Sequence, residues 1–438
     1  MKTPRRTKGN DLLVFFVVAT LTATAMISAQ RPSIYEGAPI HYETRVEGDV
    51  VDQLRLAIEG GKTMLVHDRE HGYLKSLLAA LDIPLSSQVL VFSKTSFQNR
   101  LISPASPRAI YFGDDVYIGW VRGSSVIELS AVHPKQGAIF YTLTRTPEKP
   151  VFERKVGECL RCHGPSNAEG MPSHLIRSVH PDSRGMPIMR AGSHRTFHTS
   201  PLNERWGGWY VSGTSGEQLH MGNKLVREGE EFVDISSGHN IKDLDSLFHT
   251  APYATRHSDI AALMVLEHQA QMHNLISYAN FETRLAEHTQ KAIGGTLGKT
   301  SSGVNLSTRR RIRAAASKVL DHLVFCDEAP LTATIQGTSG FQDEFSRLGP
   351  RDPKDRSLRE LDLKTRLLRY PCSYLIYSPA FDALPQPVLN YIYNKLRKIL
   401  IGKVHHSKYS HLSPADRRAI LEILIATKPN LPESWRQE

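Results

Sequence analysis

The sequence lacks most of the patterns that would place it in a common functional class. It has no internal repeat, no low-complexity tract and, after its first 30 residues, no apolar run long enough to span a membrane. It also has neither a glycine loop that would cradle phosphates nor a dinucleotide-binding fingerprint. The stretch Gly213–Gly216 lacks the flanking residues of a hydrolase nucleophile elbow. We therefore set aside nucleotide-dependent chemistry and a hydrolase of that type.

Cysteine is scarce, with only four in the chain. Two of them, Cys326 and Cys372, are too far apart in the sequence to form the second Cys-x-x-Cys pair that a zinc ribbon requires. In an oxidising compartment they could form a disulfide, or they could be two buried thiols that pack as small apolar side chains. Both alternatives stay open from the sequence.

Acidic residues are fewer than basic ones, 44 against 54, so the net charge is +10. Part of the excess lies near the N-terminus and in Arg309–Arg313, so the basic residues do not form one continuous face. Nucleic-acid binding requires basic residues gathered with aromatic or helical readers, and the sequence shows no such module. We expect no nucleic-acid partner, and a basic surface that can help to dock an acidic redox partner.

The most informative stretch is the pentad Cys159–His163, which reads Cys-x-x-Cys-His. Two cysteines at this spacing can each add across one vinyl group of a haem, and the adjacent histidine can then ligate the iron. A bare Cys-x-x-Cys also occurs as half of a zinc site or as a redox dithiol. A thioredoxin-like dithiol lies between a strand and a helix, which the lead-in Gly157-Glu158 does not suggest. The spacing therefore favours covalent haem attachment.

At the pentad the chain resembles c-type cytochromes. The resemblance implies one haem c, covalently attached through Cys159 and Cys162, with His163 as an axial ligand of its iron. Three further stretches resemble those of large exported single-haem proteins of bacteria: Arg205–Val211, Ser258–Arg284 and Tyr370–Pro385. This second similarity implies that most of the mature chain is one unit, and it adds no functional residue.

Residues 1–30 read as an export signal. Four basic residues precede an apolar core, Leu12–Leu21, and Ala23–Ala25 supplies the small residues that suit cleavage. An uncleaved membrane anchor is the alternative, because the apolar run is near the lower limit for spanning a bilayer. Since haem c is attached after export of the unfolded chain, signal and pentad agree and predict the bacterial periplasm.

The periodicity of the chain predicts an α+β protein. Two short helices, around Val51–Ile58 and Tyr73–Leu81, precede an antiparallel β-meander between Gln88 and Leu143. From Cys159 to Asn223 the chain is rich in glycine, proline and histidine and shows little periodicity, as expected of a segment that wraps a haem. Four helices are predicted after it: 258–293, capped by Ser258, 307–323, capped by Ser307, 387–401, and one from a capping box at Ser413 to before Pro429.

These elements suggest three parts. We expect a signal peptide over 1–30, a β-rich haem c-binding region over 31–242 and an α-helical lobe over 243–438 packed on it. The stretch Arg205–Val211 holds two tryptophans and two glycines. It can be a core strand that packs on the meander, or its indoles can line the haem while Arg205 pairs with a propionate.

The ligand on the other side of the iron decides the function. A strong second ligand closes the site for electron transfer, whereas an open position lets a small molecule bind and react. Candidates downstream of the pentad are Met171, Met186, Met189, Met221, His174, His180, His194, His198 and His220. We favour His198 and His220 as iron ligands, because they flank the aromatic stretch and could return over a haem, and Met186 comes next.

A later helical stretch also carries histidine. Met264, His268 and Met272 share one face, which is more typical of core packing than of a ligand set. His268 and His273 point about 140° apart on an ideal helix, so they are no ready-made metal pair.

The sequence therefore predicts an exported mono-haem c-type cytochrome that carries electrons to or from a periplasmic redox protein. The alternative is a haem enzyme with an open or displaceable axial position, acting on a small oxidant such as peroxide or a nitrogen oxide, with Arg177, Arg190 or Arg195 stabilising charge. A haem-based sensor or an interaction module is a third possibility. No catalytic residue and no oligomeric state follow from the sequence.

Overall fold

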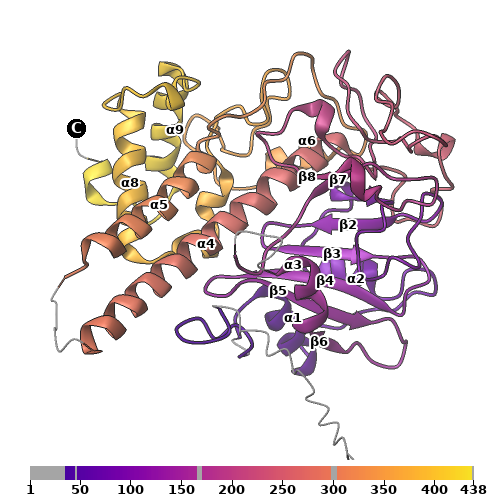
Figure 1. Ribbon diagram of the computed structural model, residues 1–438, viewed down its shortest axis with the longest axis horizontal. Coiled ribbons are helices and arrows are strands. Elements are labelled where there is room, and N and C mark those ends of the chain that lie inside the picture. The colour runs from indigo at the N-terminus through magenta and orange to yellow at the C-terminus, as the bar shows by residue number, and fades with distance from the viewer. Residues whose placement is uncertain (1–34, 45–46, 165–169, 297–302, 437–438) are drawn as a thin grey trace, which may run out of the picture.

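The chain folds into a sheet-bearing half and a helical half that lie side by side (Figure 1). The computed structural model describes residues 35–44, 47–164, 170–296 and 303–436. An antiparallel sheet of seven strands occupies the N-terminal half, and helices dominate the C-terminal end. The α+β class is confirmed at this level. The expected signal peptide, residues 1–30, lies outside the described residues.

The large sheet has the strand order β6-β5-β4-β3-β2-β1-β9. Its strands are β1 (Val89–Val91), β2 (Arg108–Phe112), β3 (Val116–Trp120), β4 (Val126–His133), β5 (Gly137–Thr144), β6 (Phe152–Arg154) and β9 (Trp209–Tyr210). Strands β1 to β5 are the predicted meander. Strand β9 joins the edge beside β1, where Tyr210 pairs with Leu90, so the tryptophan-rich stretch contributes a core strand. A separate two-stranded sheet is formed by β7 (Arg177–Val179) and β8 (Ser193–Arg195).

Gly137 lets the hairpin of β4 and β5 pack against the long helix α4 (Ile260–Thr296). Its backbone has a positive φ of 66°, which glycine adopts readily. A Cβ atom at this position would come within 2.8 Å of Ser277 Oγ on α4. The start of β5 is therefore also a point of close approach between sheet and helix.

One face of the sheet packs on two short helices. Side chains alternate between faces along a strand, so Leu129 of β4 and its register partner Tyr141 of β5 share this face. They belong to a core that also contains residues of α1 (Val50–Glu59) and α2 (Leu74–Ala80). Both helices occur where the periodicity predicts them.

The opposite face of the sheet turns toward α4 and the pentad. Tyr117, Ser130 and Phe140 lie next to one another on this face in the strand register. The core that begins here continues into the helical half, because it contains Tyr117 together with Leu323. The two halves thus share one core, and the boundary expected near residue 243 stays a prediction.

Four of the helices after β9 match the predicted ones. Besides α4 they are α5 (Leu306–Leu323), α8 (Gln386–Leu400) and α9 (Pro414–Thr427), and the further helices are α6 (Phe341–Arg347) and α7 (Pro379–Asp382). Short 3₁₀ turns occur at Leu85–Ser87, Met189–Ala191, Leu202–Glu204, Leu244–Ser246, Tyr374–Tyr377, Ser407–Tyr409 and Glu433–Trp435. The capping box at Ser413 is confirmed.

The other two predicted caps are wrong by one or two residues. Asp259, not Ser258, accepts the first backbone N–H groups of α4, and Asn305, not Ser307, caps α5. Ser258 is already engaged, because its hydroxyl donates to the Tyr210 carbonyl and accepts from the Leu90 N–H. The start of α4 is thereby tied to β1 and β9.

Cys326 and Cys372 are free thiols buried in the core of the helical half. Of the two alternatives left by the sequence, the structure has the buried thiols. Burial raises the pKa of each to about 12, so both stay neutral.

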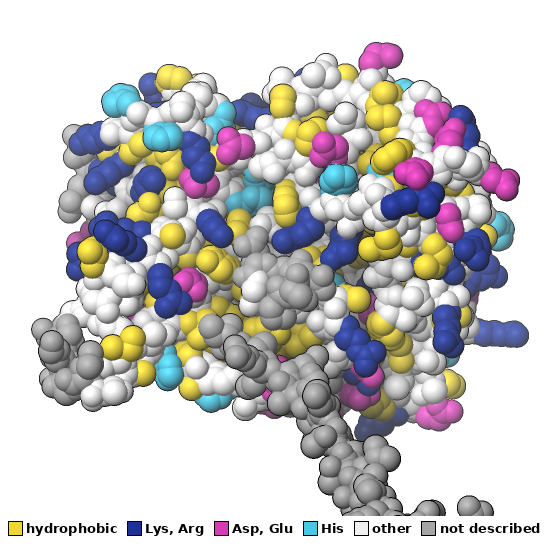
Figure 2. Space-filling model, viewed as in Figure 1, with side chains coloured by type: hydrophobic (Ala, Val, Ile, Leu, Met, Phe, Trp, Pro, Cys, Tyr) yellow, Lys and Arg dark blue, Asp and Glu magenta, His cyan; other side chains and the backbone are white. Residues whose placement is uncertain are grey.

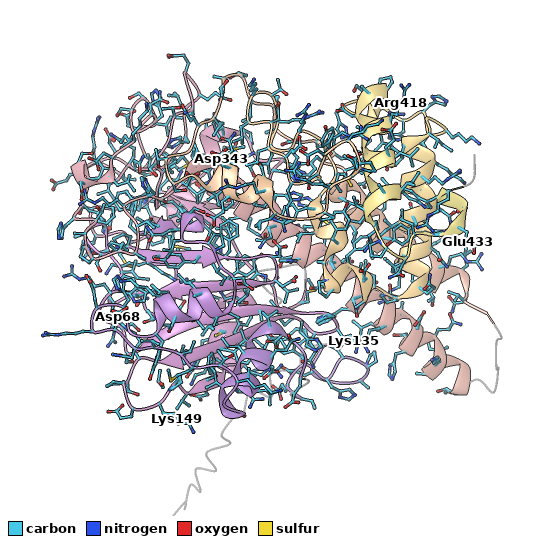
Figure 3. All side chains as sticks on the ribbon, turned by 180° about the vertical axis from the view of Figure 1, so that it is seen from behind. Asp68, Lys135, Lys149, Asp343, Arg418 and Glu433 are labelled. Atoms are coloured by element: carbon cyan, nitrogen blue, oxygen red, sulfur yellow. The ribbon has the colours of Figure 1, made fainter. Side chains whose placement is uncertain are left out.

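Charged residues of both signs lie on the surface of both halves (Figure 3). Seen from behind, Asp68 and Lys149 lie on the sheet-bearing half, and Arg418 and Glu433 on the helical half (Figure 3). Basic side chains are scattered over the face shown in Figure 2 and form no single patch there. Within the described residues, no helix combines the length and apolar character needed to cross a membrane.

Candidate functional site

The pentad forms most of a short helix, α3 (Gly157–His163), which follows β6. Cys159 is partly buried, Cys162 is exposed, and both are free thiols. Residues three apart in a helix are neighbours on its surface, so the two thiols lie on one turn. Burial raises the pKa of Cys159 to about 12, which keeps it a neutral thiol in the protein alone.

The imidazole of His163 is oriented by a backbone carbonyl. Its Nδ1 lies 2.8 Å from the carbonyl oxygen of Ser173. Because a carbonyl only accepts hydrogen bonds, Nδ1 carries the proton and Nε2 keeps its lone pair. Burial also lowers the pKa of His163, so the ring is neutral at pH 7. This is the form in which a histidine binds a metal through its other nitrogen.

The sheet supplies the surroundings of α3. The ring of Phe140 on β5 packs against His163, with centroids 4.7 Å apart. Arg108 of β2 and Glu128 of β4 form an ion pair on the same face, and both act electrostatically on Cys159 and His163. The pentad therefore lies against one face of the sheet, next to an aromatic ring and an ion pair.

The pentad offers the groups that a covalently attached haem requires. Two thiols on one helical turn are available for thioether bonds, and one imidazole nitrogen is free to ligate an iron. The Ser173 carbonyl engages only Nδ1, so the lone pair of Nε2 lies on the other side of the ring from this hydrogen bond. The residues present therefore fit haem c.

His198, one of the two predicted second ligands, lies in a different cluster. Its ring stacks on His322 and Phe325, with centroids 4.0 and 4.8 Å away, and its Nδ1 is 3.0 Å from His268 Nδ1. His198 thus packs against residues of the helical half, and none of these contacts involves His163. Its role as an iron ligand stays a prediction.

His220, the other predicted second ligand, packs beside Trp206, with ring centroids 5.2 Å apart. Its Nδ1 accepts a hydrogen bond from the Gly222 N–H at 3.1 Å, and burial lowers its pKa to about 3. These contacts likewise do not involve the pentad, so this assignment also stays a prediction. Met186, the next choice, is 43% exposed at the surface.

A line of buried polar groups runs from the pentad toward α4. His174 is coupled electrostatically to His163, and its ring lies 4.4 Å from that of Tyr117. The Tyr117 hydroxyl is 2.8 Å from His273 Nδ1, and His273 Nε2 is 3.8 Å from the Asp115 carboxylate. Asp115 lines a cavity of about 370 Å³ between β3 and α6. The line therefore connects this cavity with the surroundings of the pentad.

Replacing Asp115 with asparagine should stabilise the protein at alkaline pH. Burial, together with the nearby Asp114, raises the pKa of Asp115 from 3.8 to about 7. A raised carboxyl pKa destabilises the folded state as pH rises from the unfolded value through the folded one, and this cost is absent below both. Asparagine carries no charge, so we expect a gain about 2 kcal/mol larger at pH 8 than at pH 5 after allowance for solvent screening. Urea unfolding at the two pH values measures it.

Asp114→Asn is the matched control for this substitution. Asp114 pairs with Arg359 and is half exposed, so its replacement removes an ion pair and should give no comparable gain at pH 8. An Asp115→Asn gain of the same size at both pH values would contradict the prediction, because it would not depend on ionisation.

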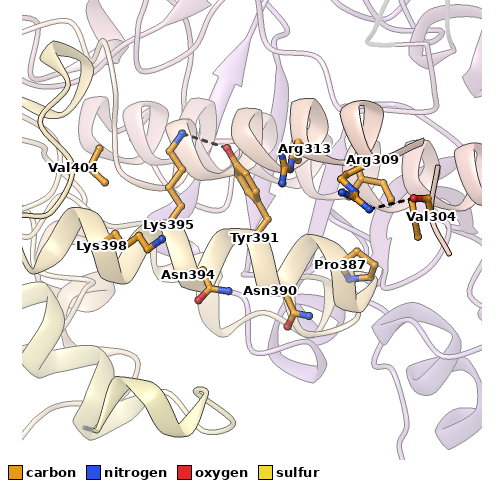
Figure 4. Close-up of a pocket in the computed structure, with 11 residues that line it drawn as sticks. Val304, Arg309, Arg313, Pro387, Asn390, Tyr391, Asn394, Lys395, Lys398 and Val404 are labelled. Carbon is orange, nitrogen blue, oxygen red and sulfur yellow. Dashed lines mark hydrogen bonds between the residues drawn. The ribbon is translucent and has the colours of Figure 1, made fainter. Parts of the chain in front are cut away.

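A second cavity of about 680 Å³ lies between α5 and α8 and is shown in Figure 4. Arg309 and Arg313 of α5 and Lys395 and Lys398 of α8 line it, and its lining residues include no carboxylate or thiol. Lys395 contacts the hydroxyl of Tyr391 at 3.3 Å. The cavity is basic and carries no group suited to acid–base or nucleophilic chemistry at neutral pH.

Sequence patterns identify the pentad, but they miss the Ser173 carbonyl that orients His163 and the contact of His322 with His198. Ser173 acts through a backbone carbonyl, which any residue could supply, so no side-chain signal exists for it. His322 lies on the buried side of α5, at helical spacing from Ala315 and Val319, where a core residue is the usual expectation.

The pentad on α3 and the buried histidines around α4 are thus the two places where chemistry-bearing side chains gather in the described part of the chain. Their arrangement has to be interpreted from the molecule itself. Compared with known proteins, the chain matches no family model, no curated protein and no solved structure.

Proposed function

We propose that the protein is an exported c-type cytochrome that holds one haem c and carries electrons in the periplasm. Cys159 and Cys162 would form the thioether bonds, and His163 would ligate the iron. The observation that carries the proposal is the hydrogen bond from His163 Nδ1 to the Ser173 carbonyl, which leaves Nε2 free beside two thiols on one turn. A bound haem supplies a one-electron ferric–ferrous couple.

The residues around the pentad would tune that couple. The Ser173 carbonyl accepts a hydrogen bond from the Nδ1–H of His163, which fixes the ring orientation and makes the imidazole a stronger electron donor to the iron. Phe140 covers one face of the imidazole and limits the access of water. The Arg108–Glu128 pair keeps the charge near the thiols balanced. Each of these groups acts on the potential through hydrogen bonding, burial or charge.

Three features of the sequence outside the pentad support this proposal. The irregular segment between the pentad and α4 would wrap the cofactor, as the sequence predicts. The export signal would bring the unfolded chain to the compartment in which haem c is attached. The partner would be a periplasmic redox protein, to which the basic surface contributes attraction.

A haem enzyme acting on a small oxidant is the second candidate function. An enzyme requires an open axial position on the iron. The two predicted second ligands, His198 and His220, pack against other side chains, and this observation favours an open position. Of the three arginines considered for charge stabilisation, Arg177 acts electrostatically on His163. Arg190 pairs with Glu231 at the surface.

The double variant Cys159→Ala, Cys162→Ala should lose covalently bound haem completely, because no other thiol lies in a Cys-x-x-Cys-His sequence. A pyridine haemochrome assay of the purified, denatured protein measures this. The variant Cys326→Ala, Cys372→Ala is the control and should keep its haem, since these buried thiols lie in the core of the helical half. Covalent haem in the first variant would refute the attachment.

Absorption spectra then separate the two functions. An electron carrier should give a low-spin spectrum that cyanide and carbon monoxide leave unchanged, because both axial positions are filled. A high-spin ferric band that shifts with these ligands would favour the enzyme. His198→Ala and His220→Ala identify the second ligand if either changes a low-spin spectrum.

A further inference from the structure

Three histidines from distant segments meet inside the protein. His198 follows β8, His268 lies in the first third of α4, and His322 is in the last turn of α5. Each offers a ring nitrogen, and the three nitrogens lie within 4.8 Å of one another. All three residues are buried, and the Nδ1 atoms of His198 and His268 are 3.0 Å apart.

The outer edges of two of these rings are hydrogen-bonded to the protein. His268 Nε2 lies 2.7 Å from the Ser373 hydroxyl, and His322 Nε2 lies 3.3 Å from the backbone carbonyl of His268. The carbonyl only accepts, so His322 Nε2 carries the proton and its Nδ1 keeps a lone pair. When the Ser373 oxygen accepts in the same way, His268 also presents a bare Nδ1. Histidines that bind metals show this pattern, with the outer N–H donated to the protein.

The cluster leaves a ring nitrogen unsatisfied in the protein alone. The Nε2 of His198 is buried and has no hydrogen bond of good geometry, although the nearby backbone of Cys326 acts on this ring as a hydrogen-bond partner. Buried polar atoms nearly always have a partner, so an exception in the interior requires an explanation. Moreover, only one of the two facing Nδ1 atoms of His198 and His268 can donate to the other.

Aromatic stacking explains only part of this arrangement. The rings of His268 and Phe325 are 4.2 Å apart and inclined by 16°, and His198 stacks on the same phenylalanine. Stacking accounts for flat side chains at these positions. Apolar rings would stack equally well, however, and would leave no ring nitrogen without a partner.

We propose that His198, His268 and His322 together bind one divalent transition-metal ion of the zinc or copper class, at a site separate from the pentad. Three imidazole nitrogens suit such ions, whereas calcium and magnesium take oxygen ligands. Burial lowers the pKa of His322 to about 4 and those of the other two rings well below 6.5, so no proton has to leave before an ion binds. Three protein ligands leave the fourth position of a tetrahedral ion for a further small ligand.

The charged groups next to the cluster hold its parts together. Arg205 and Glu267 are buried and 3.1 Å apart, and Arg205 also donates to the His198 carbonyl at 3.0 Å. This pair links the segment that carries His198 to the helix that carries His268. The Glu267 carboxylate offsets part of the Arg205 charge, because burial raises the pKa of this carboxyl to about 7.

The test is a metal titration of the full-length chain after removal of metals with a chelator. We expect one equivalent of Zn²⁺ per chain, counted by elemental mass spectrometry, which distinguishes zinc from haem iron. Ser373→Ala keeps all three ligands and should weaken zinc binding roughly 10- to 100-fold, because His268 loses its outer partner. His322→Ala should weaken it further. Circular dichroism checks that each variant is folded. If His322→Ala does not fold, the zinc affinity of Ser373→Ala still tests the site.

Exposed histidines provide the control. His405→Ala, His406→Ala removes two adjacent surface imidazoles and should leave the zinc stoichiometry and affinity unchanged. Zinc binding that is lost in this control and kept in Ser373→Ala would overturn the proposal. A wild-type chain that takes up neither Zn²⁺ nor Cu²⁺ would also overturn it and leave the cluster as an aromatic stack. Zinc is counted separately from haem iron, so the failure of this proposal is distinct from a failure of the proposed function. Zinc binding at this site would also exclude His198 as an axial ligand of the haem iron.

Discussion

Arg205→Met should destabilise the protein by about 3–5 kcal/mol at pH 8, because it leaves the Glu267 carboxyl, whose pKa burial already raises to about 7, without its buried counter-ion. Arg205 is 3% exposed and Glu267 is fully buried, with the ion-pair atoms 3.1 Å apart. The guanidinium also donates to the backbone carbonyls of His198 and Ser200, which would lose these donors. The midpoint of unfolding in urea measures the loss, provided that the slope of the transition is unchanged.

Two further variants show which part of the loss comes from the charge. Arg205→Met, Glu267→Leu removes both ions, so most of the lost stability should return, except for the share of the two carbonyls. Arg227→Met removes an ion pair with Asp234 of the same 3.1 Å length, but this arginine is 63% exposed. That control should leave the midpoint almost unchanged, because exposed pairs contribute little. If Arg205→Met and Arg227→Met had equal effects, the buried pair would not stabilise the fold.

The Arg205–Glu267 pair also shows what the sequence could and could not predict. An arginine at the start of an aromatic stretch must have a counter-charge when it is buried, and one of the two interpretations of the sequence paired it with a haem propionate. The structure pairs it with a residue 62 positions away. The hydrophobic residues around Arg205 indicate that its charge is buried. They contain no information about which distant carboxylate pairs with it.

Local features were predictable because a few neighbouring residues determine them. The meander follows from β-forming runs separated by turns, and the capping box at Ser413 lies within four residues. At the start of α4, Ser258 and Asp259 are both good capping residues in adjacent positions. The sequence alone could not choose between them, because the choice depends on Ser258 bonding to β1 and β9.

The histidine cluster was beyond prediction for a different reason. His198, His268 and His322 come from three segments whose contacts depend on how α4 and α5 pack and on the irregular chain after β8. Taken singly, each histidine sits in an apolar or irregular context typical of a core residue. The pentad, in contrast, is specified by chemistry within five residues, so its donor set can be read without the fold.

Asp259→Ala should cost about 4 kcal/mol or more, because one buried carboxylate satisfies two separate parts of the chain. Its Oδ1 accepts from the N–H groups of Ala261 and Ala262, which start α4. Its Oδ2 accepts from the Thr338 N–H and from both the N–H and the hydroxyl of Ser339. Loss of a helix cap typically costs about 1 kcal/mol, and each orphaned buried donor adds about 1–3 kcal/mol.

Asn305→Ala and Asp259→Asn separate the two roles of this carboxylate. Asn305 caps α5 through one hydrogen bond to the Thr308 N–H, so its loss should cost only about 1 kcal/mol. Asp259→Asn keeps one acceptor oxygen for the helix but turns an amide toward the donors of residues 338 and 339, so it should recover only part of the stability. Hydrogen exchange should then be faster at the amides of Thr338 and Ser339, while that of Ala261 stays protected. If Asp259→Ala and Asn305→Ala lost equal stability, the Asp259 carboxylate would act as a helix cap alone. Its predicted role in linking α4 to Thr338 and Ser339 would then be wrong.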